Sequence, residues 1–209
     1  MLKRDKKPSV VYWIDNILYL NITNKCPNNC YFCIRRFRNG IQEFKLKLES
    51  EPKIEEVKKK LRKVIRKKNW KEIVFCGFGE PLERLGLVLE VTRQINNQYR
   101  KTIRMNTNGQ GYLLNKGTDF VNELKSAGVT KVCISLNAHN KEAYNQICKP
   151  ENKDAYENVL DFIIRAKEVG LETIATAVRV PEVEITKVKE VAESLGVKFV
   201  LREYIPLFW

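Results

Sequence analysis

Three of the six cysteines stand close together in the sequence, with a spacing that is typical of a metal-binding loop. Cys26, Cys30 and Cys33 form a C-x3-C-x2-C pattern, and the other three cysteines are scattered. In a reducing compartment such a group indicates a metal site and not a disulfide framework. A structural zinc site needs four nitrogen or sulfur ligands, whereas a four-iron cluster held by three thiolates keeps one iron open to an incoming molecule. The pattern favours an iron–sulfur cluster and leaves zinc as the alternative.

A second segment that could contact a ligand is Cys76-Gly-Phe-Gly-Glu-Pro-Leu82, which follows a strand pattern. Gly77 and Gly79 would let the backbone approach a ligand closely, and Glu80 offers a carboxylate to an ammonium group. Taken alone, the segment also suits a tight turn in which Glu-Pro begins the next helix. Residues 106–109, Asn-Thr-Asn-Gly, end the following strand and by themselves also suit a turn.

Both segments lie within an alternation of strand and helix patterns. Six segments have strand composition, and five have the apolar period of a helix. The strands are predicted at residues 18–22, 73–75, 102–105, 131–136, 172–178 and 198–201, and the helices at 53–67, 82–98, 115–127, 154–169 and 185–195. This order predicts an α/β fold with a parallel sheet and crossover helices. Residues 34–52 are predicted to be one long irregular connection, and residues 1–209 a single domain.

The strands favour a barrel over an open sheet because one face of the sheet carries polar side chains. By period-two alternation this face holds Tyr19, Asn21, Thr23, Arg104, Asn106, Asn108, Ser135, Asn137 and, after the fifth strand, Arg179. A closed barrel interior would be mostly aliphatic. Polar groups near the carboxyl ends of six strands therefore predict an incomplete barrel around a solvated cavity.

Composition limits the function classes without choosing one. The 209 residues are 44% hydrophobic and 30% charged, which excludes disordered and collagen-like chains. No apolar stretch is long enough to span a membrane, and the N-terminus has no secretory signal, so a cytoplasmic protein without a membrane partner is expected. The net charge of +13 permits nucleic-acid binding, although the lysine runs also fit a solvated helix face.

Taken together, the two segments resemble a known family. The three cysteines, with Phe32 before the last of them, are followed one strand later by Gly-x-Gly-Glu-Pro. This combination resembles the radical S-adenosylmethionine (SAM) superfamily, whose core is a six-stranded partial (β/α)6 barrel of the TIM type. More narrowly, residues 18–30 and Ser-Leu-Asn-Ala at 135–138 resemble the small subgroup associated with TatD-family hydrolases.

The resemblance implies a role for each matching position. Cys26, Cys30 and Cys33 would ligate a 4Fe–4S cluster, whose open iron would be chelated by the amino and carboxylate groups of SAM. The stretch from Gly77 to Pro81 matches the motif that binds the methionine amine, with Phe78 where many members have glycine. The remaining positions implied for the cofactor are Phe32 at adenine, Ser135 and Asn137 at the ribose or the methionine carboxylate, and Arg179 at that carboxylate, at the substrate or in a structural ion pair. Asn108 is a further cofactor-binding candidate without a more specific role.

The implied reaction is the reductive cleavage of SAM to methionine and a 5′-deoxyadenosyl radical, which abstracts hydrogen from a substrate that the sequence does not identify. An external electron donor of the flavodoxin or ferredoxin type is implied, and a TatD-family hydrolase is an implied partner. The family also contains activases that act on proteins, and the basic charge keeps an RNA substrate open. The competing hypothesis from the residues is a zinc-stabilised, basic nucleic-acid-binding module.

Cys148 is a candidate catalytic residue outside these motifs. It is expected in a connection after the fourth strand, on the cavity side of the barrel, where its thiol could donate a proton or a hydrogen atom to a product radical. Cys76 and Cys133 fit small core residues on strands instead.

Overall fold

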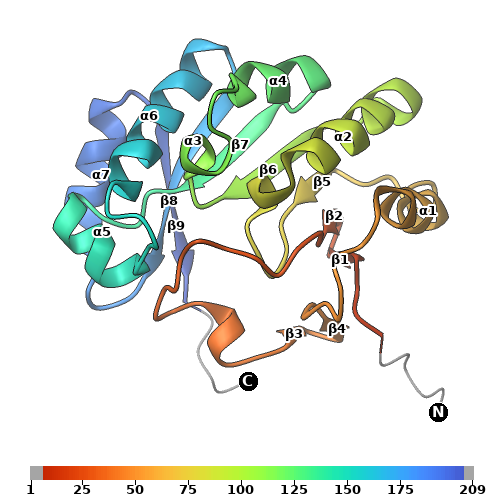
Figure 1. Ribbon diagram of the computed structural model, residues 1–209, viewed down its shortest axis with the longest axis horizontal. Coiled ribbons are helices and arrows are strands. Elements are labelled where there is room, and N and C mark those ends of the chain that lie inside the picture. The colour runs from red at the N-terminus through yellow and green to blue at the C-terminus, as the bar shows by residue number, and fades with distance from the viewer. Residues whose placement is uncertain (1–6, 205–209) are drawn as a thin grey trace.

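A seven-stranded sheet organises the computed structural model, which describes residues 7–204 (Figure 1). Six strands are parallel and follow one another across the sheet. They are β2 (Ile17–Leu20), β5 (Glu72–Phe75), β6 (Ile103–Thr107), β7 (Lys131–Ser135), β8 (Glu172–Arg179) and β9 (Lys198–Glu203). All six predicted strands are present, and the fold is the expected six-stranded partial (β/α)6 barrel.

Five helices connect these strands and cover one side of the sheet (Figure 1). They are α1 (Ile54–Val64), α2 (Leu85–Tyr99), α4 (Phe120–Ala127), α6 (Ala155–Glu168) and α7 (Ile185–Ser194). Each buries an apolar stripe on the sheet, as Val57 and Leu61 do for α1, because the period of 3.6 residues brings such positions to one face. Gly128 ends α4 with a φ of 113°, a conformation that glycine adopts without steric cost.

Several short elements were missed by the sequence patterns. Strand β1 (Val11–Ile14) pairs antiparallel with β2 at the sheet edge. Residues 34–52 are not wholly irregular, because they contain the 3-10 helix η1 (Ile34–Arg36) and the hairpin of β3 (Gly40–Ile41) and β4 (Phe44–Lys45). Elements of two to four residues are too short to show a hydrophobic period.

The helical region around 111–127 is divided, and a further helix follows β7. Instead of one helix from 115, the chain forms α3 (Gly111–Leu114) and then α4, which begins where the Asp119 carboxylate accepts a hydrogen bond from the Asn122 N–H. The additional helix α5 (Lys141–Cys148) is capped by Asn140 in the same way. Cys148 is thus the last residue of a helix within the expected connection after β7.

No helix within residues 7–204 is long and apolar enough to cross a membrane.

The main apolar core lies between the sheet and its helices, where the rings of Phe120 and Phe162 meet edge to face with centroids 5.0 Å apart. Both rings are fully buried, although they come from α4 and α6.

Replacing Phe162 with alanine should lower the free energy of unfolding by about 3–5 kcal/mol, because it removes a fully buried ring and leaves a cavity. The matched control is Ile164→Ala on the same helix, where the side chain is 41% exposed; it should cost less than about 1 kcal/mol. Urea denaturation of both variants measures the two values. Equal losses would contradict this assignment of the core.

Candidate functional site

The cysteine loop, defined here as residues 21–33, follows the carboxyl end of β2 and is held against the segment after β5. The Gly79 N–H donates to the Thr23 carbonyl at 2.8 Å, and the Glu80 N–H donates to the Lys25 carbonyl at 2.7 Å. These bonds continue the β2–β5 pairing beyond the two strands. The two segments singled out in the sequence therefore lie side by side.

Gly77 and Gly79 permit this close approach. A Cβ atom at Gly77 would overlap the side chain and Cα of Asn21, and one at Gly79 would overlap the backbone of Asn24 and Lys25. The expectation that both glycines bring the backbone near a ligand stays a prediction. Their lack of a side chain brings the segment 77–80 against the cysteine loop itself.

Asn21 anchors the beginning of the cysteine loop from a fully buried position. Its amide nitrogen donates to the carbonyls of Ser9, at 3.0 Å, and Leu46, at 2.7 Å. Its amide oxygen accepts from the Phe78 N–H at 2.9 Å. One side chain thus satisfies three buried backbone groups from three separate segments, each of which would be costly to leave unpaired.

The far side of the cysteine loop is tied to the end of α5. The Asn29 N–H donates to the Cys148 carbonyl at 3.0 Å, and the Glu151 N–H donates to the Pro27 carbonyl at 2.9 Å. Below them, the buried Asn28 side chain donates to the Tyr144 hydroxyl at 3.1 Å and accepts from the Gln110 amide. Segments after β2, β6 and β7 thus meet under the loop.

Each cysteine of the loop has a polar neighbour. The Cys26 sulfur accepts a hydrogen bond from the Asn108 amide at 3.6 Å, and the Cys33 sulfur accepts one from Arg35 Nε at 3.4 Å. Burial raises the pKa of Cys26 to about 12. The pKa of Cys30 is raised by two effects, of which a hydrogen bond with Cys148 is the larger and burial is the second. Without a bound metal, both thiols are therefore protonated at neutral pH.

The donor set of the loop fits a cluster with three thiolate ligands. All three cysteines are free. The nearby Arg35 guanidinium favours the thiolate forms of Cys26 and Cys30 and donates a hydrogen bond to Cys33. Among residues 7–204, however, no three cysteine, histidine or acidic side chains already converge as a metal-binding group. Binding of a cluster would require rotation of the cysteine side chains and release of their protons.

Glu80 is oriented towards the end of β6 and is only 3% exposed. Its carboxylate accepts hydrogen bonds from the Leu82 N–H at 3.0 Å, the Thr107 hydroxyl at 2.8 Å and the Asn108 N–H at 2.6 Å. Burial raises its pKa to about 7. The carboxylate that was expected to face an ammonium group thus holds the β6 loop, and with it Asn108, beside Cys26.

The remaining cofactor candidates differ in burial and in the residues that they contact. Asn137 has a φ of 57°, and its amide donates to the sulfur of Cys148, at the end of α5, at 3.5 Å. Ser135 is half-buried at the end of β7, and Phe32 is half-buried against the core. Phe78 packs into a separate small cluster with Tyr12 and Leu46, and Pro81 is the first residue of the 3-10 helix η2 (Pro81–Arg84).

Arg179 is the one candidate that the structure places elsewhere. Its side chain is 56% exposed and forms an ion pair with Glu203 at 3.0 Å. Of the three roles expected for Arg179, this is the structural ion pair. The cavity side of β8 carries Ile174 and Thr176, so Arg179 has the opposite parity. The prediction that it faces inward was wrong because residues 173–177 are all buried and show no alternation.

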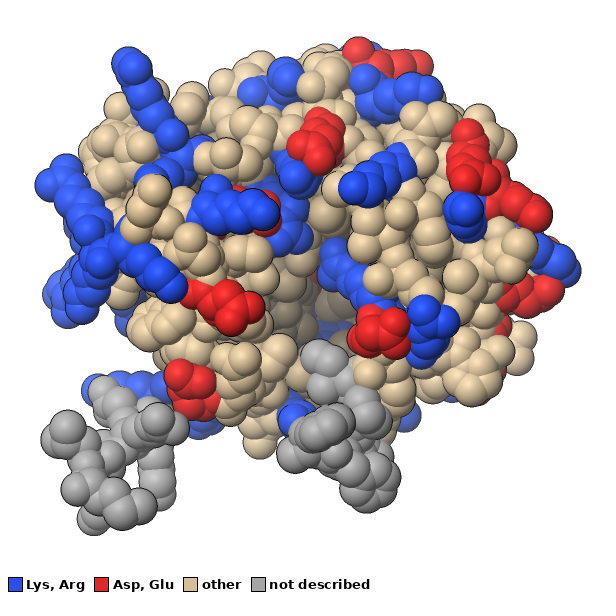
Figure 2. Space-filling model, turned by 180° about the vertical axis from the view of Figure 1, so that it is seen from behind, with Lys and Arg blue, Asp and Glu red and all other residues tan. Residues whose placement is uncertain are grey.

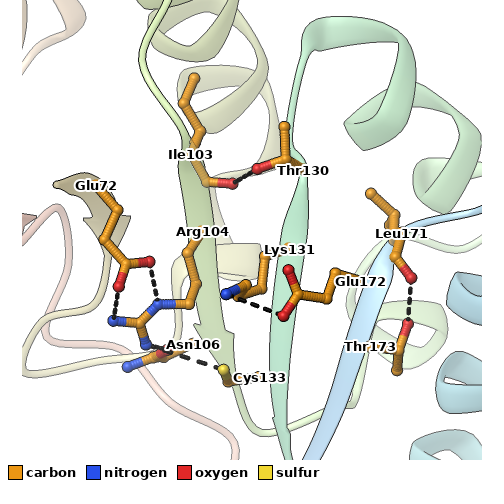
Figure 3. Close-up of polar contacts among 10 residues, drawn as sticks. All are labelled: Glu72, Ile103, Arg104, Asn106, Thr130, Lys131, Cys133, Leu171, Glu172 and Thr173. Carbon is orange, nitrogen blue, oxygen red and sulfur yellow. Dashed lines mark hydrogen bonds and ion pairs between the residues drawn. The ribbon is translucent and has the colours of Figure 1, made fainter.

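The inner face of the barrel surrounds a cavity of about 390 Å³. Arg104 crosses it from β6, with Nε 2.7 Å from a Glu72 oxygen and Nη1 2.7 Å from the Asn106 oxygen (Figure 3). Lys131 pairs with Glu172 at 3.0 Å in the same view. The polar interior predicted from Arg104 and Asn106 is confirmed.

Sequence reasoning missed two cationic side chains of this cavity, Lys131 and Arg202. Arg202 on β9 lines it together with Val200. Alternation along β9 puts residues 198, 200 and 202 on one face, which could have indicated that Arg202 faces the cavity. The six residues of this strand, however, mix exposed and half-buried positions and show no clear inner face.

A model of the radical SAM superfamily matches residues 20–195. A probable GTP 3′,8-cyclase of Methanococcus maripaludis strain C5 is 32% identical over 191 residues, which is 90% of this chain and 58% of that protein. The GTP 3′,8-cyclase of Aliarcobacter butzleri is 30% identical over 88% of this chain and 53% of its own length. The chain thus spans somewhat more than half the length of these relatives.

Solved structures show the same fold at lower identity. TYW1 with a lysine–pyruvate adduct bound has a TM-score of 0.64 and 20% identity, over 93% of this chain and 66% of that one. Streptococcus suis SuiB bound to S-adenosylmethionine has a TM-score of 0.66 and 14% identity, over 92% of this chain and 41% of that one.

Gly79→Ala should lower the free energy of unfolding by about 1–3 kcal/mol, because the added methyl group meets the backbone of the cysteine loop. Gly86→Ala is the matched control: nothing lies within 4 Å of its Cβ position on α2, and alanine should stabilise this helix by up to about 1 kcal/mol. Urea denaturation checks both values. A neutral Gly79→Ala would show that the contact between the two segments is loose.

The stability of the metal-free protein should fall as the pH rises through the folded pKa of Glu80. The buried carboxyl keeps its proton up to about pH 7, whereas in the unfolded chain it ionises near its ordinary pKa of 4.5. Between these values the folded state binds more protons, so its stability decreases with increasing pH. A shift of this size corresponds to about 3 kcal/mol.

The comparison with Glu80→Gln isolates this effect. The free energy of unfolding of the wild type, minus that of the variant, should decrease between about pH 5 and pH 8 in denaturant titrations. A difference that stays constant over this range would contradict the raised pKa.

Proposed function

Because the chain belongs to the radical SAM superfamily and is an enzyme of that class, we propose that Cys26, Cys30 and Cys33 hold the 4Fe–4S cluster that this family uses together with SAM. When bound, the cluster supplies the electron that cleaves SAM to methionine and a 5′-deoxyadenosyl radical, and this radical takes hydrogen from the substrate. We treat residues 1–209 as one radical SAM core domain.

The contact between the cysteine loop and residues 77–80 carries the proposal. The hydrogen bonds of Gly79 and Glu80 to the loop bring the proposed methionine-binding motif next to the proposed cluster ligands. A cofactor that chelates the open iron must be bound by both segments at once, and a fixed spacing between them reduces the freedom lost on binding.

Neighbouring polar groups support the three cysteines. Glu80 accepts from the Asn108 N–H, and the Asn108 amide in turn reaches the Cys26 sulfur. Hydrogen bonds to ligand sulfur atoms change the reduction potential of a cluster. In the proposal Glu80 is a positioning residue for Asn108, while Ser135, Asn137, Phe32 and the backbone of 77–81 face SAM.

We assign Cys148 a packing role in place of the catalytic role that the sequence suggested. Its side chain is fully buried. The sulfur accepts a hydrogen bond from the Asn137 amide and forms a hydrogen bond with the Cys30 thiol. This burial favours packing beneath the cysteine loop over hydrogen donation to a product radical, because a donor must reach the product.

The names of the relatives, the sequence motifs and the net charge each suggest a substrate or a partner. The relatives are named GTP 3′,8-cyclases, which makes GTP the substrate to test first. The partnership with a TatD-family hydrolase rests on residues 18–30 and 135–138 alone. An external flavodoxin or ferredoxin would supply electrons in the cytoplasm. An activase or an RNA-modifying enzyme is the second candidate, favoured by the net charge of +13.

The test is anaerobic reconstitution with iron and sulfide, followed by dithionite and SAM. Wild-type protein should bind about four irons per chain and release 5′-deoxyadenosine, measured by chromatography. Cys30→Ala should lose both properties. The matched control, Cys76→Ala, removes a cysteine outside the loop and should retain the iron.

Two results would contradict the proposal. One is colourless protein with a single zinc ion and no nucleoside product, which would support the zinc-binding hypothesis. The other is equal iron loss in the Cys30→Ala and Cys76→Ala variants, since the loop cysteines would then not be the specific ligands.

A further inference from the structure

The interior cavity is built by inward-facing side chains from all six parallel strands. Its volume of about 390 Å³ is at the small end of the range for sites that bind small molecules. Figure 2 shows the face of the molecule turned away from the viewer of Figure 1; it is hollowed near its centre, with basic and acidic side chains around the hollow. A barrel whose interior is hollow and polar has room for a substrate inside it.

Most charges of this cavity already have partners. Arg104 forms two contacts with Glu72, at 2.7 and 3.3 Å, and the side chains of this pair are 13% and 12% exposed. Lys131 pairs with Glu172 at 3.0 Å. The amino-terminal end of the barrel interior is therefore polar but close to neutral.

Arg202 differs from these residues because it has no hydrogen-bond or ion-pair partner within residues 7–204. On β9 it lies opposite Val178 of β8, and two residues earlier Val200 lies opposite Thr176, which itself pairs with Ser135. Arg202 thus stands towards the carboxyl ends of the strands, the edge from which the cysteine loop emerges. A half-buried guanidinium without a partner favours an anion there.

We propose that the interior cavity binds a small substrate with one anionic group, a carboxylate, which pairs with Arg202, and that it does not accept a nucleoside triphosphate. This inference rests on the proposed function, since it assigns the substrate class of the same enzyme. The carboxylate lies at the carboxyl edge, and the rest of the substrate extends towards Asn106, Cys133 and the paired floor. Four residues along β8, from Val178 to Ile174, span about 13 Å.

A triphosphate does not fit the charges of this cavity. It carries several negative charges, whereas among the cavity-lining residues within 7–204 one cation is unpaired. To engage Arg104 it would have to displace Glu72, and the displaced carboxylate would remain in the interior beside the ligand. The charge of Lys131 is already offset by Glu172 at 3.0 Å. Like charges at short range in a partly buried site repel strongly. The relatives named GTP 3′,8-cyclases therefore differ from this chain in substrate.

The probes are 4-fluorobenzoate and its neutral analogue 4-fluorobenzamide, whose weak binding to the reconstituted protein is measured by fluorine NMR. The carboxylate should bind saturably to the wild type, and Arg202→Gln should weaken it by at least about tenfold, as for loss of a charged hydrogen bond. The amide should bind the variant and the wild type equally. Arg179→Gln, an equal charge change outside the cavity, should alter neither.

Competition tests the rest of the inference. GTP at about 1 mM should not displace 4-fluorobenzoate from the wild type. Glu172→Gln leaves Lys131 unpaired, and this second free cation should raise the affinity for GTP several-fold. The control, Glu193→Gln, removes a carboxylate from the exposed pair with Lys189 and should leave the affinity for GTP unchanged.

Four results would overturn the inference: no saturable binding of the carboxylate, the same affinity in Arg202→Gln, displacement by GTP, or displacement by SAM. The last would show that Arg202 binds the carboxylate of SAM. Release of 5′-deoxyadenosine by the wild type is measured in parallel. If it occurs while any of these four results is found, the substrate class fails and the proposed function stands; if it does not occur, the proposed function itself fails.

Discussion

The buried amide of Asn21 is the contact on which the geometry of the site depends. Located just beyond β2, it bonds to the backbone of Ser9, Leu46 and Phe78. It therefore joins the segment before β1, the segment after β4 and the loop after β5 at the point where the cysteine loop begins. No apolar residue could replace it without leaving three buried backbone groups unpaired.

The same constraint explains why glycine stands at 77 and 79. Backbone bonds between two adjacent loops require a separation at which a side chain on either one would collide, and both positions meet the backbone of the cysteine loop. Glu80 then extends the arrangement to Asn108 through its carboxylate. Together these contacts fix the backbone around the cysteines while the three thiols remain free. Such a scaffold suits a loop that must bind a cluster without refolding.

Charge has a different function inside the barrel. Ion pairs such as Arg104 with Glu72 keep the interior polar without a large net charge, because a buried charge is tolerated when it is paired. An unpaired Arg202 in the same cavity then becomes selective for an anion. The chain covers little more than half the length of its named relatives, so shared core elements are compatible with different substrates.

The sequence by itself determined the order of the six parallel strands and the main helices between them, the partial barrel and the family. Hydrophobic periodicity and the cysteine spacing depend only on residues that are near one another in the sequence. They can therefore be recognised without knowledge of the fold. The tertiary structure alone decided that Gly77 and Gly79 meet the cysteine loop, that Glu80 holds Asn108, and that Arg179 faces outward. These features depend on which segments become neighbours and on the face that each residue takes. In a strand buried on both sides, such as 173–177, no alternation remains from which that face could be predicted.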